Sequence, residues 1–266
     1  MNISFLTPPL VEGPKIAFFV PLPKFLHQVP LAMNVGNGEF GLPVSMTVVS
    51  SWFCMFILFM IFKVGTKKLE VVPRGKLQII LETLFVFLDN LVFQSLGKYK
   101  DRFISFISCL FLFILSGNIL TFFPIPWVTK IADKSIFIHP AFRTPTADLN
   151  TTVGLALLTA IVFIGTNIKQ LGLFGYIKNF ASPVPILLPL NIISELAKPI
   201  NMSFRLFGNM FAGMVIMGLL YKAVPAVVPA PLHLYFDLFS GIVQSFVFIM
   251  LSIVNIQSSL GDSVND

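Results

Sequence analysis

One arginine stands alone in a long apolar part of the chain and is the first residue that could do chemistry. Arg205 is the only charged residue between Lys198 and Lys222. A guanidinium stays protonated in proteins. Holding this charge near the centre of a bilayer costs between about 2.5 and more than about 10 kcal/mol. Such a residue needs a water-filled cavity or a partner of opposite sign, so Arg205 marks a candidate functional site.

Polar side chains surround this arginine at helical spacing. Asn201, Arg205 and Asn209 are four residues apart, and positions four apart share one face of an α-helix. Lys198 lies about two turns before Arg205, and Glu195 lies three residues earlier again. The spacing predicts a polar stripe along one side of an otherwise apolar helix.

A second polar stripe occurs in the last apolar stretch. Asp237, Gly241 and Gln244 follow helical spacing, with Asn255 further along. A carboxylate such as Asp237 needs a partner, a proton or a cation in an apolar setting. The two stretches follow each other through a short connection, which favours antiparallel packing. Arg205 would then face Gln244, with Asp237 nearer the outer end of the pair.

Other interpretations of these polar residues stay open. Arg205 and Asp237 could form a buried ion pair that serves only packing. Lys198 and Glu195 could extend to the membrane interface. The amides could simply join helices by hydrogen bonds, each worth about 0.6 to about 2 kcal/mol. We favour that interpretation for Asn255. The other amides of the two stripes are Asn201, Asn209 and Gln244.

The composition indicates which elements must position these residues. The chain has 266 residues, of which 56% are hydrophobic and 11% are charged, against about 25% charged in soluble domains. A spanning helix needs about 20 mostly apolar residues. We therefore predict an all-α, polytopic membrane protein with about five spanning helices, the last two long and tilted. The predicted helices cover residues 44–62, 103–123, 149–168, 186–221 and 224–256.

A further helix and the loop charges complete the predicted layout. Apolar residues recur at helical spacing over residues 77–96, which predicts an amphipathic helix at the cytoplasmic interface or against another membrane subunit. Residues 1–43 would be an extracytoplasmic segment, and residues 44–266 a single membrane domain. The loop charges predict an outside N-terminus and a cytoplasmic C-terminus. The basic residues behind this orientation are Lys63, Lys67, Lys68, Arg74, Lys76, Lys98, Lys100, Arg102, Lys169 and Lys178.

Several classes of protein are disfavoured. The formal charge of +6 lies in short loops beside apolar segments, which does not suggest nucleic-acid binding. Cys54 and Cys109 lie inside apolar runs and predict packing rather than a disulfide or a metal site. We find no signal peptide and no sequence motif for a cofactor.

Three separated motifs resemble those of subunit a of F-type ATP synthases. The first is Glu195-Leu-Ala-Lys-Pro-Ile-Asn-Met-Ser-Phe-Arg205, which continues through Leu-Phe-Gly-Asn-Met-Phe-Ala to Gly213. The second, Pro145-Thr-Ala-Asp148-Leu-Asn150, precedes an apolar stretch, and the third is Gln244-Ser-Phe-Val-Phe. Together they define a signature region at residues 145–257.

The resemblance implies the ion channel of a rotary motor without ATP chemistry of its own. Two half-channels would serve the carboxylates of a c-subunit ring, and the b-subunit stalk and membrane lipids would be further partners. The family's essential arginine maps onto Arg205. The resemblance thus adds Asp148 and Asn150 to the candidate site, which otherwise comprises Arg205, Asp237, Gln244, Asn209, Asn201, Lys198 and Glu195.

Departures from the family pattern leave the transported ion open. Met214 stands where Glu or His is common, Asp237 where His or Glu is common, and Asn191 where Glu is common. Fewer titratable groups and more oxygen ligands suit Na⁺ as well as protons. A different class of function, a secondary transporter that moves an anionic solute past Arg205, is the alternative. The lack of a presequence-like N-terminus favours a bacterial plasma membrane.

Overall fold

In a computed structural model, six α-helices within the described residues build the body of the protein. They are α1 (Met46–Gly65), α2 (Lys76–Leu96), α3 (Lys100–Phe122), α4 (Leu149–Phe180), α5 (Leu188–Ala223) and α7 (Ser240–Leu260). Short helical turns are η3 (Gly97–Tyr99), η4 (Pro145–Ala147), η5 (Pro185–Leu187) and the π-helical η6 (Leu234–Phe239). The described residues are 16–21, 33–34, 40–67, 73, 75–122, 126–130, 136–140, 144–180, 185–223, 231–232 and 234–261.

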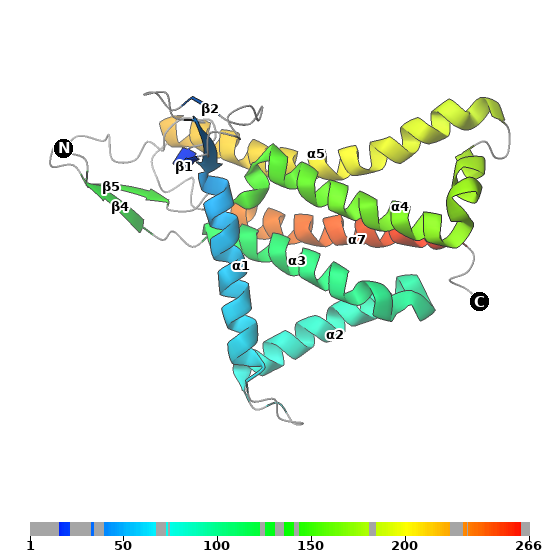
Figure 1. Ribbon diagram of the computed structural model, residues 1–266. Helices are drawn as coiled ribbons and strands as arrows, with labels where there is room; N and C mark the ends of the chain where they lie inside the picture. Colours follow the sequence, from blue (N-terminus) through cyan, green and yellow to red (C-terminus); the bar gives the residue numbers. More distant parts are fainter. Residues whose placement is uncertain are drawn as a thin grey trace.

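Two small antiparallel sheets accompany the helices and were not anticipated from the sequence. One contains β1 (Ile16–Pro21), β2 (Met33–Asn34) and β3 (Phe40–Ser45) in the order β1-β3-β2. The other is a hairpin of β4 (Pro126–Lys130) and β5 (Ile136–Pro140). Both lie at the side of the helical body where α1 begins (Figure 1). The prediction of a helical, polytopic membrane protein is confirmed for the body itself.

Five stretches are long and apolar enough to cross a membrane within the described residues. They are residues 47–65, 76–120, 149–176, 188–217 and 234–260. The second stretch joins α2 and α3, and the chain turns between them at Gly97, which has a φ of 50°. A positive φ is accessible to glycine because it lacks a Cβ atom. The predicted amphipathic segment is therefore a separate helix, α2, that turns back into α3.

The long helices are bent rather than straight. α5 has 36 residues, or about 54 Å at 1.5 Å per residue, well beyond the about 30 Å of a hydrocarbon core. Pro199 lies inside α5 and cannot donate a backbone hydrogen bond to the preceding turn. α4 is broken at Gly172, where φ is 70° and ψ is 163°. The expectation that the long stretches tilt or kink is consistent with the bent α5 in Figure 1.

α7 lies at the centre of the helical body. It contacts α2, α3, α4 and α5, while α4 has its most extensive contact with α5. In Figure 1, α3, α4, α5 and α7 lie side by side, α2 runs obliquely to them, and α1 crosses near one end of the group. α1, α2 and α3 outline a triangle in the same view, because α2 meets the end of α1 and then returns through α3.

The buried face of α7 follows helical spacing. Ile249, Ile253 and Ile256 are each fully buried, and Phe248 is 1% exposed. Lipid tails are as apolar as these side chains, so burial from water does not hold helices together in a bilayer. Close packing and hydrogen bonds between helices must supply the specificity instead.

A buried asparagine supplies one such set of hydrogen bonds. Asn118 on α3 is 1% exposed, and its Nδ2 donates to Gly241 O at 3.0 Å and to Ser245 Oγ at 3.2 Å. Its Oδ1 accepts a bond of 2.9 Å from the hydroxyl of Thr146, which is fully buried. One side chain thus joins α3, η4 and α7, three parts of the chain that are far apart in sequence.

The same contact requires a glycine on α7. A Cβ atom added at Gly241 would lie 2.9 Å from Cβ of Asn118, closer than real Cβ atoms approach. Since the obstructing atom lies at the base of the Asn118 side chain, rotation about its χ angles does not remove the overlap. Gly241 therefore sets how closely α3 and α7 approach.

Gly241→Ala should destabilise the protein by about 1 to about 3 kcal/mol, because overpacking forces α3 and α7 apart. Thermal unfolding of the purified protein in detergent measures the effect. Gly154→Ala is the matched control, since a Cβ atom there meets nothing within 4 Å. Equal unfolding midpoints for the two variants would contradict the close approach at Gly241.

The bond between Thr146 and Asn118 should be measurable in a double-mutant cycle of Asn118→Leu with Thr146→Val. We expect a coupling free energy of about 0.6 to about 1.7 kcal/mol, the range of hydrogen bonds between membrane helices. Unfolding in mixed detergent micelles gives the four free energies. Thr166→Val is the control partner, because the Thr166 hydroxyl bonds Val162 O of its own helix at 2.7 Å and should be additive with Asn118→Leu. Additivity in both cycles would mean that the Asn118 bond contributes nothing.

Candidate functional site

The residues around Arg205 divide into a buried and an exposed side of α5. Leu206 is fully buried, and Met202 and Ser203 are each 2% exposed. Arg205 itself is exposed, and Phe204 beside it is 59% exposed. The helix therefore turns its small and aliphatic residues into the body and its guanidinium outward.

Arg205 has no partner within the part of the chain that the structure describes. No described residue forms an ion pair or a hydrogen bond with its guanidinium. The charge is therefore not neutralised by its own chain there. In a membrane, such a charge is compensated by water, by a carboxylate such as that of Asp237, or by a group on another molecule.

Two hydrogen bonds hold the backbone on either side of Arg205. Ser203 Oγ donates to Thr152 Oγ1 of α4 at 3.3 Å. Asn209 Nδ2 donates to Ser240 Oγ at the start of α7 at 2.6 Å. These anchors lie two residues before and four residues after the arginine, so they limit how α5 can rotate at this point.

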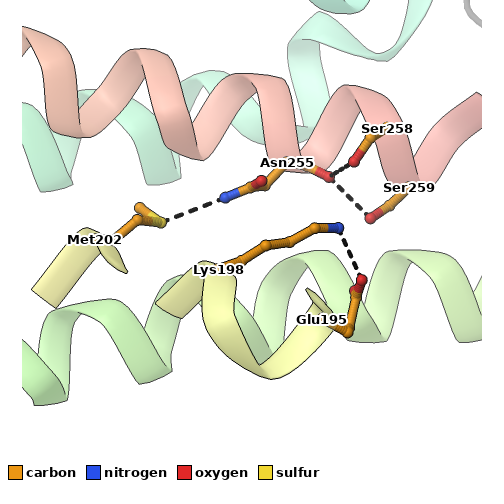
Figure 2. A network of polar contacts seen from close by, with 6 residues as sticks. All are labelled: Glu195, Lys198, Met202, Asn255, Ser258 and Ser259. Carbon is orange, nitrogen blue, oxygen red and sulfur yellow. Dashed lines mark hydrogen bonds and ion pairs between the residues drawn. The ribbon is translucent and has the colours of Figure 1, made fainter. Parts of the chain in front are cut away.

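The polar stripe continues along α5 toward its N-terminal end. Lys198 Nζ lies 2.8 Å from Glu195 Oε2 and 5.4 Å from the centroid of the Phe163 ring on α4. Figure 2 shows both side chains on the part of α5 that faces α7. The second carboxylate oxygen of Glu195 is buried and has no hydrogen-bond partner among the described residues. Asn201, one turn beyond Lys198, is exposed.

Asn255 joins the two long helices, as we favoured from the sequence. Its Nδ2 donates to the thioether sulfur of Met202 at 3.4 Å, and its backbone carbonyl accepts bonds of 2.9 Å from Ser258 and Ser259 (Figure 2). With Asn209 bonded to Ser240, this contact confirms that α5 and α7 pack antiparallel. The bridging interpretation of Asn255 is thereby confirmed.

Gln244 does not bond with Arg205 in the described structure. Its side chain is 7% exposed, and its Nε2 has no hydrogen-bond partner among the described residues. It lies one turn beyond Ser240 on α7, whereas the guanidinium is on the exposed side of α5. Asp237 belongs to η6 just before α7, but the placement of its side chain lies outside the described residues.

Asp148 connects the start of α4 to α1. Its Oδ2 accepts a bond of 2.8 Å from Thr47 Oγ1, and its Oδ1 accepts a bond of 3.0 Å from the backbone N–H of Asn150. The second bond is typical of a residue that caps a helix N-terminus. Both carboxylate oxygens are thus engaged, while the Asn150 side chain is on the exposed side.

Four polar residues near the site were not identified from the sequence. Asn118 interrupts a predicted spanning segment, and a lone amide in such a segment indicates a polar contact inside the protein. Thr146 lies in the same motif as the candidates Asp148 and Asn150. Thr47 and Ser240 carry no signal, because a hydroxyl in an apolar helix commonly bonds its own backbone.

The described site is an arrangement of charged and amide side chains along two helices. No group of three or more His, Cys, Asp or Glu residues that could hold a metal occurs among the described residues. Cys54 is buried, with Sγ at 2.9 Å from Ser116 Oγ, and Cys109 is exposed. What the helices provide is an outward guanidinium between two groups of polar side chains along α5 and α7.

Comparisons with known proteins agree with the resemblance seen in the motifs. Residues 48–257 match the family model described as "ATP synthase A chain". The "ATP synthase subunit a, sodium ion specific" of Propionigenium modestum is 57% identical over 262 residues, which cover 98% of this chain and 90% of that protein. The "ATP synthase subunit a" of Moorella thermoacetica is 36% identical over 215 residues, which cover 81% of this chain and 90% of that protein.

These matches decide between the two classes of function left open above. Neither comparison supports a secondary transporter of an anionic solute. The matched region contains all five membrane-crossing stretches almost completely, so the family assignment covers the whole helical body. The chain therefore belongs to the ATP synthase A chain family, the multi-pass, ion-translocating membrane subunits of F-type ATP synthases, which work with the c-ring and the other subunits of the complex.

Proposed function

We propose that this chain carries Na⁺ to and from the c-ring and that Arg205 is the fixed charge that the ring's carboxylates pass. The observation that carries the proposal is the outward guanidinium, which no described residue of its own chain neutralises. A passing carboxylate would supply the missing opposite charge. Its departure would be compensated by the next carboxylate of the ring.

Electrostatics gives Arg205 two tasks in this proposal. A positive charge beside a carboxylate favours the ionised form and so expels the bound cation. Two unit charges at 4 Å interact by about 4 kcal/mol at an effective dielectric constant of 20. The same charge repels a cation that would pass directly between the half-channels. That barrier exceeds the about 2.3 kcal/mol per charge that 100 mV supplies.

Polar residues on either side of Arg205 would line the two half-channels. Glu195, Lys198 and Asn201 lie toward the N-terminal end of α5 and would serve one half-channel. Asn209, Gln244 and Asp237 lie toward the other ends of the antiparallel pair and would serve the second. The Nε2 of the buried Gln244 has no hydrogen-bond partner among the described residues and would donate to a water molecule of this half-channel. Asp148 and Asn150 would hold the start of α4 beside this second half-channel.

The absence of titratable side chains at two positions of this chain favours sodium over protons as the transported ion. Met214 and Asn191 replace positions that are commonly titratable in the family, and a proton path uses titratable groups. Amide, hydroxyl and carboxylate oxygens are suitable ligands for a hard cation. The relative from Propionigenium modestum, whose name specifies sodium, is 57% identical to this chain.

The placement in the cell is proposed from the loop charges. Basic residues follow α1 and flank the turn between α2 and α3, and such residues are retained in the cytoplasm. The protein would lie in a bacterial inner membrane. Residues 1–43 would then be outside the cell membrane, and the membrane domain of residues 44–266 would end on the cytoplasmic side. The b-subunit stalk would be a further partner of this domain.

Arg205→Ala should abolish ATP-driven ion pumping by the assembled complex in proteoliposomes, because no fixed charge remains to expel the ion from the ring. Arg205→Lys should lose most of the activity, since a flexible point charge lacks the planar fork of a guanidinium. Arg102→Ala is the matched control, because Arg102 is an exposed arginine in the first turn of α3, away from the site. Coupled pumping by the Arg205→Ala complex would end the proposal.

Sodium should stimulate ATP hydrolysis by the complex at alkaline pH, where protons are too scarce to load the ring. The measurement compares hydrolysis rates at increasing sodium concentration and fixed pH, with potassium replacing sodium to keep the ionic strength constant. Rates that do not respond to sodium would favour protons and overturn the choice of ion, while leaving the role of Arg205 intact.

A further inference from the structure

Two adjoining cavities lie where the end of α1 meets the start of α2. The first has a volume of about 450 Å³ and is lined by Val64, Gly65, Lys67, Gly75, Lys76, Leu77 and Gln78. The second has a volume of about 350 Å³ and is lined by Phe62, Gly65, Thr66, Gln78, Leu81, Glu82, Phe85 and Val86. Gly65 and Gln78 belong to both, so the cavities are continuous along one groove.

The two ends of this α1–α2 groove differ in chemistry. The first cavity has two exposed ammonium groups, those of Lys67 and Lys76, and contains no acidic residue. The second is mainly apolar: Phe62 is 38% exposed, and Phe85 and Val86 are each 55% exposed. A molecule that fits both parts needs an anionic head and a long apolar body.

The walls of the groove are held in place by the packing of α1 on α2. Gly65 is buried, and a Cβ atom there would overlap the side chain of Leu81. Gln78 is 6% exposed, and its Nε2 donates to Glu82 Oε1 at 2.7 Å. Glu82 carries the one carboxylate among the residues that line the groove. It lies six residues after Lys76, or about 9 Å along the helix, and the bond from Gln78 fixes its position. The carboxylate is therefore separated from the basic end.

We propose that the α1–α2 groove binds an anionic phospholipid, with its phosphate between Lys67 and Lys76 and an acyl chain along Leu81, Phe85 and Val86. Charge complementarity selects this occupant, because a neutral lipid or an apolar helix would leave both lysines without an anion. Basic pockets between helices at a membrane surface are known to bind anionic headgroups. The sequence around the groove adds net positive charge, since Lys63 in the last turn of α1 and Lys68 and Arg74 in the connection outnumber Glu70. The site is separate from Arg205, so it does not depend on the choice of transported ion.

The test uses the purified complex in nanodiscs that contain equal amounts of phosphatidylcholine and phosphatidylglycerol. A phosphatidylglycerol with a photoreactive acyl chain should label α2 near Phe85 and Val86, and peptide mass spectrometry locates the label. Lys67→Gln combined with Lys76→Gln should weaken this labelling about 30-fold, the factor that corresponds to about 1 kcal/mol for each lysine near an anionic surface. Val86→Trp, which fills the apolar end, should abolish it.

A matched pair of lysines provides the control. Lys98→Gln combined with Lys169→Gln removes the same charge at two exposed positions outside the groove and should leave the labelling unchanged. Assembly of each variant complex is checked by its ATP hydrolysis and subunit composition. The proposal is overturned if photoreactive phosphatidylcholine labels α2 equally well and independently of the lysines. It is also overturned if Val86→Cys cross-links to another subunit in place of lipid, since a protein helix would then occupy the groove.

Discussion

The structure depends on one electrostatic constraint: a permanently charged guanidinium on a membrane helix needs compensation, and no described residue of its own chain supplies it. Arg205 is exposed, whereas Leu206 beside it is buried, and Ser203 and Asn209 form hydrogen bonds with α4 and α7. An arginine bound permanently to a carboxylate of its own chain would be neutralised but could not interact with a moving partner. In the proposed function the exposed charge of Arg205 stays accessible to the ring, and the surrounding helices supply the rigidity that this requires.

Hydrogen bonds inside the body carry much of that rigidity. In a bilayer, apolar side chains gain little by leaving lipid for a protein interior, so polar contacts and close packing decide which helices pair. Asn118 shows both effects, because its amide joins α3 to η4 and α7, and its Cβ atom tolerates only a glycine opposite. Asn209 and Asn255 act similarly between α5 and α7. These contacts hold α7, and with it Gln244, in a defined position beside α5.

The first two helices have a different character from the rest. α2 exposes apolar side chains on several sides, among them Ile80, Phe85 and Phe93, and its buried residues lie mostly near its C-terminal end, where it meets α3. Its N-terminal half contacts mainly the end of α1, and the groove between them combines lysines with apolar walls. In the proposal of lipid binding, this corner of the molecule contacts the membrane surface and takes no part in ion movement.

The sequence alone was sufficient for what depends on local periodicity. A run of about 20 apolar residues specifies a helix wherever it occurs in lipid, and residues four apart share a face in any such helix. The spans, the separate helix α2 and the polar stripe from Glu195 to Asn209 could therefore be predicted, and the motifs gave the family. Which face of each helix is covered depends on neighbours that are distant in sequence. Only the tertiary structure decided that Arg205 points outward while Gln244 is buried, that Asn118 joins three segments, and that Asp148 bonds Thr47 across 101 positions of the chain. The short strands and the α1–α2 groove could not be predicted from the sequence either. Both arise from contacts between separate segments and not from the residue pattern within a single segment.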